Sequence, residues 1–170
     1  MNPALPRMKK KIKIRKVGLK VTIQNLQKKI PINPRSIKEA ALGVFSAEAI
    51  KKSADVTICF VNDKKIKEFN VRYLAKNRPT DVIAFDITSA DAPNNIFADI
   101  VISTDTATAN SRIFKTSPLY EIYMYVVHGI LHLLGYDDKN EEQRLRMEKR
   151  TKILLNKLNI KEICPYTEAK

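Results

Sequence analysis

Both histidines of this 170-residue chain lie in one stretch, HGILHLLGYDD, at residues 128–138. His128 and His132 are four residues apart, so a helix would place them on one face with their Cβ atoms about 5–6 Å apart. Gly135 can end that helix, and the following turn can bring Asp138 back over the two rings. This is the metzincin spacing, and zinc accepts two imidazoles and a carboxylate as ligands. The stretch therefore predicts a metal site formed by His128, His132 and Asp138.

The alternative interpretation is a buried helix in which the two histidines are ordinary core residues. Buried polar rings without partners cost free energy, and the carboxylate at the third position of the frame favours the metal. The residue after His128 is Gly129, whereas zinc peptidases with the HExxH motif carry a glutamate there as general base. Peptide hydrolysis is therefore disfavoured, and a hydrolase acting on another substrate, such as a phosphatase, stays open.

The elements that would position these residues can be inferred from hydrophobic periodicity. Strands are expected at 19–25, at 54–62 as a buried strand, within 77–87 after a turn, and at 98–104. Helices are expected at 34–53, 63–74, 105–112, 117–134 and 140–158. The helix opened by Ser117 and Pro118 is apolar nearly all round, which predicts a central position. This order predicts an α+β fold, a small mixed sheet with helices packed on it and a metzincin-like metal helix.

Local signals add detail to two of these helices and to their starting points. Asp63 and Asp105 are the expected N-caps of the second and third helices. Two apolar faces are expected to pack inward: Ile66, Phe69 and Tyr73 in the second helix, and Leu145, Ile153, Leu154, Leu155 and Leu158 in the last.

The net charge of +13 is distributed unevenly along the chain. Residues 1–38 hold 12 of the 31 lysines and arginines and no acid, which leaves 19 basic and 18 acidic residues for the rest. Clustered cations bind phosphates with release of counterions, so nucleic acid is the expected partner. A solubilising basic tail is the main alternative, and a transit peptide is a weaker one because the segment is rich in lysine rather than in arginine and serine. We interpret 1–17 as a basic N-terminal arm and 18–170 as a single metal-dependent hydrolase-like domain.

Composition limits the setting in which the protein works. No run approaches the roughly 18 apolar residues of a membrane span, and the basic N-terminus lacks the apolar region of a secretory signal. Cys59 and Cys164 fit no CxxC spacing. Lone cysteines in a chain without a signal are typical of reduced thiols, so we expect a cytoplasmic protein that does not contact membranes.

HGILHLLGYDD closely resembles the HGxLHLxGYDH signature of the YbeY family, metal-dependent single-strand endoribonucleases that act in ribosomal RNA maturation. RPTDVIAFD and ADIVIS resemble the family's PTDVLSFP and GDIVIS segments, and YEIYMYVVHG is similar to the family's approach to the metal helix. The resemblance runs from residue 55 to about residue 158, in the family's order. It implies an endoribonuclease of ribosomal RNA maturation and ribosome quality control, with single-stranded or ribosomal RNA and ribosomal subunit proteins as partners.

The resemblance also implies a zinc ion held by three histidines, of which His128 and His132 match and Asp138 replaces the third. A carboxylate lowers the net charge of a divalent site from +2 to +1, which makes the metal a weaker Lewis acid. Asp137 matches the aspartate that precedes the last ligand, and we interpret it as a turn residue or a residue that supports the ligands. Asp99, on the segment that resembles GDIVIS, is the expected supporting catalytic residue.

A second departure concerns phosphate binding. The family has Tyr-Arg before its PTDV turn, and this chain has Tyr73 followed by Leu74. Arg72 and Arg78 flank that position and are the expected substrate-binding residues if the loop presents them, and the alternative is that both are solvated surface charges. Together with Asp138, Leu74 motivates the alternative hypothesis of a non-catalytic RNA-binding factor of ribosome assembly on the same fold.

Overall fold

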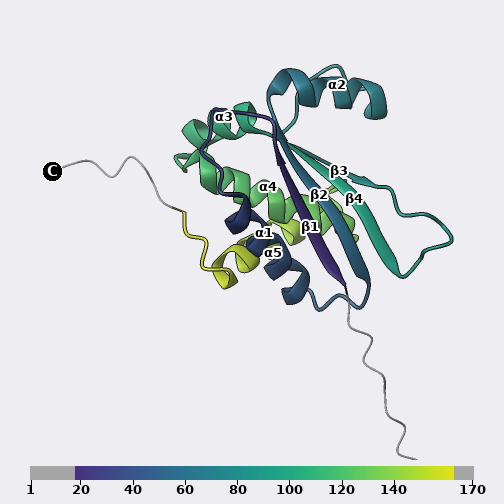
Figure 1. The fold of residues 1–170 in the computed structure, drawn as a ribbon. Coiled ribbons are helices and arrows are strands. Elements are labelled where there is room, and N and C mark those ends of the chain that lie inside the picture. The colour runs from purple at the N-terminus through teal and green to yellow at the C-terminus, as the bar shows by residue number, and fades with distance from the viewer. Residues whose placement is uncertain (1–17, 163–170) are drawn as a thin grey trace, which may run out of the picture.

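The computed structural model describes residues 18–162, and these form a four-stranded sheet with five helices (Figure 1). The strands are β1 (Leu19–Asn25), β2 (Ser53–Val61), β3 (Val82–Asp86) and β4 (Asn95–Ser103). Their order in the sheet is β1-β2-β4-β3. β1, β2 and β4 run parallel, and β3 lies antiparallel to β4 at one edge. The expected α+β fold with a small mixed sheet is confirmed.

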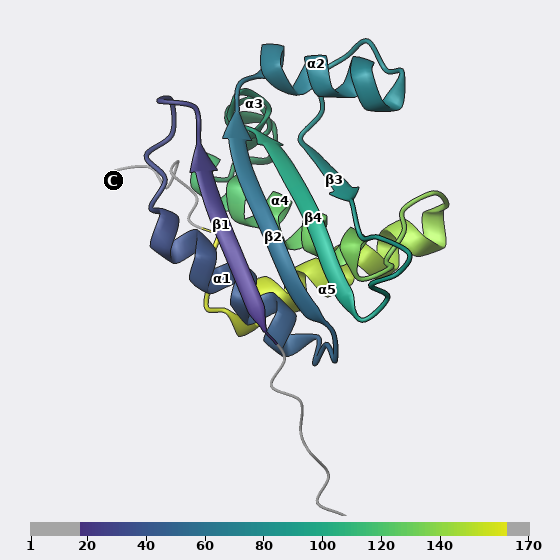
Figure 2. The ribbon, with the colours of Figure 1, turned by 45° about the vertical axis from the view of Figure 1, so that its right-hand side comes forward.

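The helices are distributed unequally over the two faces of the sheet. They are α1 (Pro34–Ala47), α2 (Asp63–Leu74), α3 (Thr104–Phe114), α4 (Pro118–Leu133) and α5 (Glu141–Lys157). In Figure 2 the sheet lies in front of α1, α4 and α5, and α2 stands at the end where β2 finishes. One face is therefore covered by three helices, and much of the other is left open.

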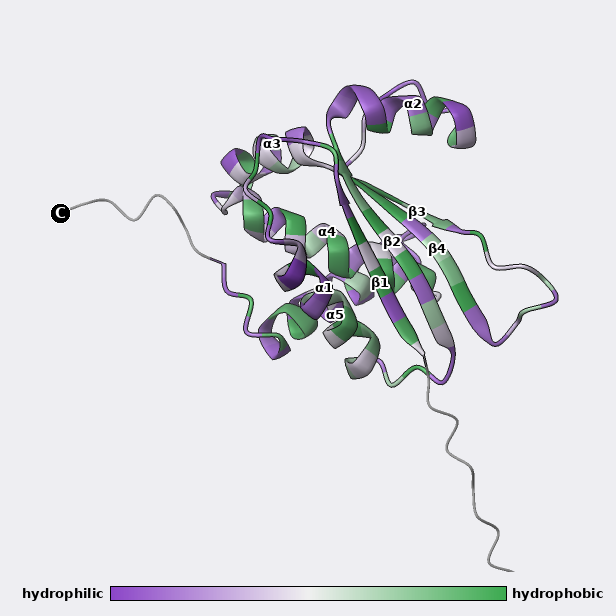
Figure 3. Ribbon diagram, viewed as in Figure 1, coloured by the Kyte–Doolittle hydropathy of each residue, from purple (hydrophilic) through white to green (hydrophobic). Residues whose placement is uncertain are grey.

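The main core lies between the sheet and α1, α4 and α5. Figure 3 shows α4 as mostly hydrophobic and α2 as largely hydrophilic. The α4 side chains Ile122, Val126, Ile130 and Leu131 are fully buried, which agrees with the central position expected for this helix. Burying an aliphatic side chain contributes about 1.5–3 kcal/mol, so α4 anchors the layer that carries the histidines.

The strand expected to be buried at 54–62 is buried along its length on one face, and on the other face only its last residue, Val61, is buried. Along β2, burial alternates, and Val56 and Ile58 point into the helix-covered core. Thr57 and Cys59 are only partly buried on the opposite face, where Cys59 packs against a small cluster that includes Ile66 of α2. Because successive side chains in a strand point to opposite faces, a β-branched run does not by itself establish burial on both.

Two expected N-caps are each displaced from the true cap. Asn62 caps α2 by accepting a hydrogen bond from the Lys65 amide, and Ser103 caps α3 in the same way. Asp63 and Asp105 therefore lie in the first turns of these helices, where their negative charge still favours the helix dipole.

The apolar faces of α2 and α5 also differ from expectation. Ile66 is fully buried, but Tyr73 is 53% exposed. In α5, Leu154 and Leu155 are buried as expected, whereas the exposed large side chains include Leu145 and Ile153. Met147 and Thr151 occupy the buried positions instead, because they share the helix face of Leu154 and Leu155.

Within residues 18–162, no helix is both long enough and apolar enough to cross a bilayer. The expected basic arm at 1–17 lies outside the described residues, as does the segment 163–170.

Candidate metal centre

The two histidines lie on α4, a helix with many fully buried side chains. The Ser117 side chain caps its first turn by accepting from the Tyr120 amide, and Pro118 occupies the first helical position. The helix ends before Gly135, which has φ +90°. Only glycine adopts this backbone conformation without strain, so Gly135 lets the chain reverse toward the helix as the spacing predicts.

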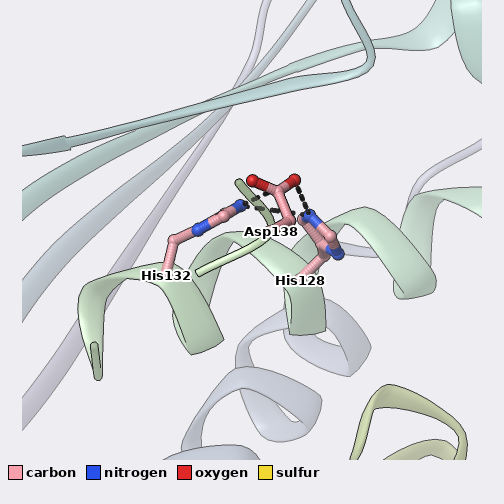
Figure 4. A group of neighbouring side chains, drawn as sticks. All are labelled: His128, His132 and Asp138. Carbon is pink, nitrogen blue, oxygen red and sulfur yellow. Dashed lines mark hydrogen bonds and ion pairs between the residues drawn. The ribbon is translucent and has the colours of Figure 1, made fainter. Parts of the chain in front are cut away.

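The structure brings His128, His132 and Asp138 together (Figure 4). The two Nε2 atoms lie 3.1 Å apart, and Oδ2 of Asp138 lies 3.8 Å from each of them. Figure 4 shows both rings rising from α4 and the carboxylate reaching over them from the following turn. The two rings are 28% and 29% exposed, so a cation can reach their nitrogens from solvent.

This triangle fits a small divalent metal. A tetrahedral zinc with ligands at about 2.1 Å holds neighbouring ligand atoms about 3.4 Å apart. The separations of 3.1 and 3.8 Å lie on either side of that value. Two nitrogens and one oxygen leave a fourth position open, which is the arrangement of catalytic rather than structural zinc sites.

Hydrogen bonds orient the ligands from outside the triangle. Nδ1 of His132 lies 3.1 Å from the backbone oxygen of Tyr136, so the ring N–H donates to it and Nε2 is left free for a metal. The Tyr136 hydroxyl donates to Glu48 at 3.2 Å, and Arg150 binds the same carboxylate at 2.6 and 2.7 Å. The turn that carries Asp138 is thereby tied to α1 and α5.

Electrostatics favour an unprotonated ring at His128. Burial lowers the pKa of its imidazole, and the neighbouring His132 lowers it further. Negative charge acts in the opposite direction, from Asp81, Asp138 and Glu148. The pKa still lies below its ordinary value, so at neutral pH the ring is uncharged and its lone pair is available to a cation.

Gly129, where zinc peptidases carry their glutamate, is explained by packing. A Cβ at this position would lie 2.9 Å from Cγ2 of Ile100 and 3.3 Å from Cγ2 of Val82. α4 thus approaches β3 and β4 so closely that a side chain at 129 would force its neighbours to shift. The close contact between the helix and the sheet therefore favours glycine at the position where a peptidase would have its glutamate.

The structure does not bring Asp99 to the metal cluster. On β4, Ala98 and Ile100 point into the core that contains α4, and Asp99 is exposed on the opposite face of the sheet. A supporting role at the metal would require contact through the sheet, so the geometry does not support that assignment.

Arg72 and Arg78 are exposed, in α2 and in the loop after it. Arg72 lies over the ring of Tyr73, with its guanidinium carbon 5.3 Å from the ring centre. The backbone oxygen of Arg78 accepts from the buried Asn70 side chain, which fixes the loop. Leu74 ends α2 and is 45% exposed.

Residue patterns alone did not reveal the groups that support the metal cluster. Glu48 and Arg150 are separated by 102 positions and meet only in the tertiary structure. Tyr136 had a usable signal, because an apolar residue directly after a helix-ending glycine frequently contacts the last turn of the helix. Asp137, next to the cluster, pairs with Lys139 at 2.7 Å and accepts from the Asp138 amide.

Known proteins resemble this chain in sequence and in fold. A family model described as endoribonuclease YbeY matches residues 22–159. The endoribonuclease YbeY of Syntrophus aciditrophicus is 31% identical over 140 residues, 79% of this chain and 87% of that protein. The one from Parabacteroides distasonis is 39% identical over 119 residues, 68% of this chain and 82% of the relative. A solution structure of a Thermotoga maritima protein has the same fold, with a TM-score of 0.54 at 22% identity over 88% of this chain and 99% of that one.

Proposed function

This chain belongs to the YbeY family of endoribonucleases, and we propose that it cleaves single-stranded RNA with a divalent metal, zinc, held by His128, His132 and Asp138. In this proposal the protein acts in ribosomal RNA maturation and ribosome quality control, in the cytoplasm, and ribosomal subunit proteins are its further partners. It treats 18–170 as one hydrolase-like domain preceded by a basic arm at 1–17.

The main support for a bound metal is the triangle of three ligand atoms, which leaves a fourth coordination position open. A divalent ion bound there would polarise a phosphodiester oxygen and lower the pKa of a water molecule. The chain's own residues hold the geometry for this chemistry: the two rings are fixed by α4, and the Tyr136 carbonyl holds the proton of His132 on Nδ1. Asp138 adds a negative charge that three histidines would lack.

RNA binding is proposed to rest on cations that lie outside the metal cluster. Arg72 and Arg78 project from the exposed end of α2 and its loop, where they can meet backbone phosphates without moving a packed element. The seven basic residues of 1–17 add an electrostatic attraction to RNA that does not depend on the RNA sequence.

A cleavage assay on matched RNAs tests the proposal. The full chain with zinc should cut a single-stranded oligonucleotide and leave the same sequence intact in a duplex. Chelation with EDTA and the substitution His132→Ala should each abolish cutting, since each removes the metal. Glu39→Gln is a matched surface control, because Glu39 is exposed and its one ion pair within residues 18–162 is with Arg35 in α1. Cutting that persists in His132→Ala would refute the metal mechanism.

The alternative, an RNA-binding assembly factor without catalysis, is favoured by one observation. Leu74 presents an apolar side chain at the end of α2, where the family's arginine would offer a charge. A chain that binds RNA with zinc loaded and cuts none of several single strands would support this alternative.

A further inference from the structure

The open face of the sheet carries a cavity of about 520 Å³, on the side away from α4. Strand residues form its floor, and α2 with the edge strand β3 forms one wall. Its lining includes Gln24, Thr57, Phe69, Tyr73, Phe85 and Asp99. The volume is within the range of sites that hold small molecules or single nucleotides.

One wall of the cavity is aromatic. The rings of Phe69 and Tyr73 are nearly parallel, with centroids 6.2 Å apart and an interplanar angle of 17°. Phe85 meets Tyr73 edge to face at 5.2 Å. Tyr73 is 53% exposed although it sits on this packed cluster. An aromatic ring held rigid by its neighbours but open to solvent provides a surface on which an unpaired base can stack.

The floor next to this wall is polar and ordered by the strand register. Thr57 on β2 pairs with Asp99 on β4, and Asp99 pairs with Phe85 on β3. A hydroxyl, a carboxylate and an aromatic ring therefore lie side by side in one row across the sheet. An ionised carboxylate only accepts hydrogen bonds, so the group that faces Asp99 must donate them.

The positive charge next to this cavity lies at its rim and not on its floor. The guanidinium of Arg72 lies over the Tyr73 ring, 5.3 Å from its centre. A guanidinium stacked in this way keeps N–H groups free for a phosphate. The cavity thus separates a phosphate-binding cation from a base-binding interior that carries negative charge.

We propose that this cavity binds one unpaired base of a single-stranded RNA and prefers a base with an amino group on its pairing edge. The base takes the place of the Arg72 guanidinium on the Tyr73 ring, its amino group donates to Asp99, and the displaced guanidinium holds an adjacent phosphate. Cytosine presents an amino donor where uracil presents a carbonyl acceptor, so Asp99 favours cytosine and repels uracil. The proposal rests on RNA being the substrate of the metal site.

The position of β3 connects the cavity with the metal helix. Val82, at the start of this edge strand, packs beside Gly129 of α4, and Phe85, near its end, lines the cavity. An RNA strand that passes around this edge can leave one base in the cavity while its backbone continues toward His128.

Binding without cleavage tests the proposal. Fluorescence anisotropy with labelled cytidine and uridine hexamers is measured in EDTA, which keeps the RNA intact. The unmodified chain should bind the cytidine hexamer several-fold more tightly. Tyr73→Leu should weaken binding of both hexamers about tenfold through lost stacking. Asp99→Asn, which alters an exposed side chain, should remove the preference for cytidine.

Phe114→Leu is the matched control, since Phe114 is 61% exposed on α3 and does not line the cavity. The proposal is overturned if Tyr73→Leu binds within twofold of the unmodified chain, if the two hexamers bind equally, or if neither binds. Circular dichroism melting of each variant shows that a loss of binding does not reflect unfolding.

The cleavage assay with zinc separates this proposal from the proposed nuclease function. If the unmodified chain cuts RNA and Tyr73→Leu still binds hexamers normally, the base site is wrong and the nuclease function stands. If Tyr73→Leu loses hexamer binding and no variant cuts RNA, the base site stands and the nuclease function fails.

Discussion

At the scale of single residues, Asp138 determines the charge of the metal cluster. Its Oδ2 lies 3.8 Å from both histidine nitrogens, so a metal bound there would have one anionic ligand. Asp138→Ala removes that ligand and should lower zinc affinity at least tenfold, whereas Asp138→His supplies another ligand and should keep zinc bound. Elemental analysis after dialysis against a weak chelator measures this. Equal zinc content in Asp138→Ala and the unmodified chain would show that the carboxylate is not a ligand.

Gly129 is the residue where helix and sheet come closest. Gly129→Ala adds a methyl group 2.9 Å from Cγ2 of Ile100, which overpacks the contact. Overpacking costs about 1–3 kcal/mol, and the better helix propensity of alanine returns at most about 1 kcal/mol. Urea denaturation should show a net loss of stability. Gly18→Ala is the control, because the added Cβ would lie 3.8 Å from Oγ of Ser53, which is ordinary van der Waals contact. A variant as stable as the unmodified chain would mean that α4 can shift freely on the sheet.

At the scale of elements, the metal turn is held by an ion pair between helices. Glu48 is only 11% exposed and binds Arg150 and the Tyr136 hydroxyl, so it joins α1, α5 and the turn before Asp138. Glu48→Ala leaves both partners without their acceptor and should cost about 1–3 kcal/mol. It should also weaken zinc binding about tenfold, because supporting contacts orient the ligands.

The control for this substitution lies in α1, the helix that ends directly before Glu48. Glu39→Ala breaks an exposed pair with Arg35 and should change the free energy of unfolding by less than about 0.5 kcal/mol. Urea denaturation and a competitive zinc titration measure the two effects. If Glu48→Ala loses stability but binds zinc normally, the ion pair supports the fold and does not position the metal turn.

The junction of α2 and α3 makes stability depend on pH. The pKa of Asp105 lies below its usual value, chiefly because Lys29 donates a hydrogen bond to it, and the Asp63 amide donates another. The folded state therefore binds a proton less readily than the unfolded state, whose aspartate titrates at about 3.9. The stability from this carboxylate is present above that value and is lost as the pH falls through the folded pKa.

In Asp105→Asn, the free energy of unfolding should consequently depend less steeply on pH in the acid range. Between about pH 5 and pH 3, the free energy of unfolding should fall less in Asp105→Asn than in the unmodified chain, because the variant lacks this titration. Urea denaturation at the two pH values, in EDTA, measures both slopes. Parallel slopes would mean that the Lys29 contact does not persist in solution.

The sequence predicted the elements better than their environment. The side of the sheet on which Asp99 lies could have been predicted from the alternation of side chains along β4. Ile100 is buried against α4, so the residue before it must face the other side of the sheet. In contrast, Glu48 and Arg150 carry no local pattern that pairs them across 102 positions. The metal triangle was predictable because three ligands within eleven residues are positioned by one helix and one turn.

At the scale of the whole molecule, charge is concentrated in the first 38 residues. Residues 1–17 hold seven lysines and arginines and no acid, while the rest of the chain is closer to neutral. If these cations meet RNA phosphates, each contact adds about 0.7 to the slope of log affinity against log salt for a single strand. The salt dependence of binding therefore reports how much of the arm engages the RNA.

Replacing the seven basic residues of 1–17 with glutamine should weaken binding of a long single strand at low salt and reduce the salt slope by several times 0.7. Cytidine hexamers should be less affected, because the cavity on the open sheet face binds them through Tyr73 and Asp99. Filter binding of a 30-nucleotide RNA across a salt series gives the slope. An unchanged slope would show that the cations of the arm do not release counterions from RNA. The arm would then act as a solubilising tail, through repulsion between copies of the protein.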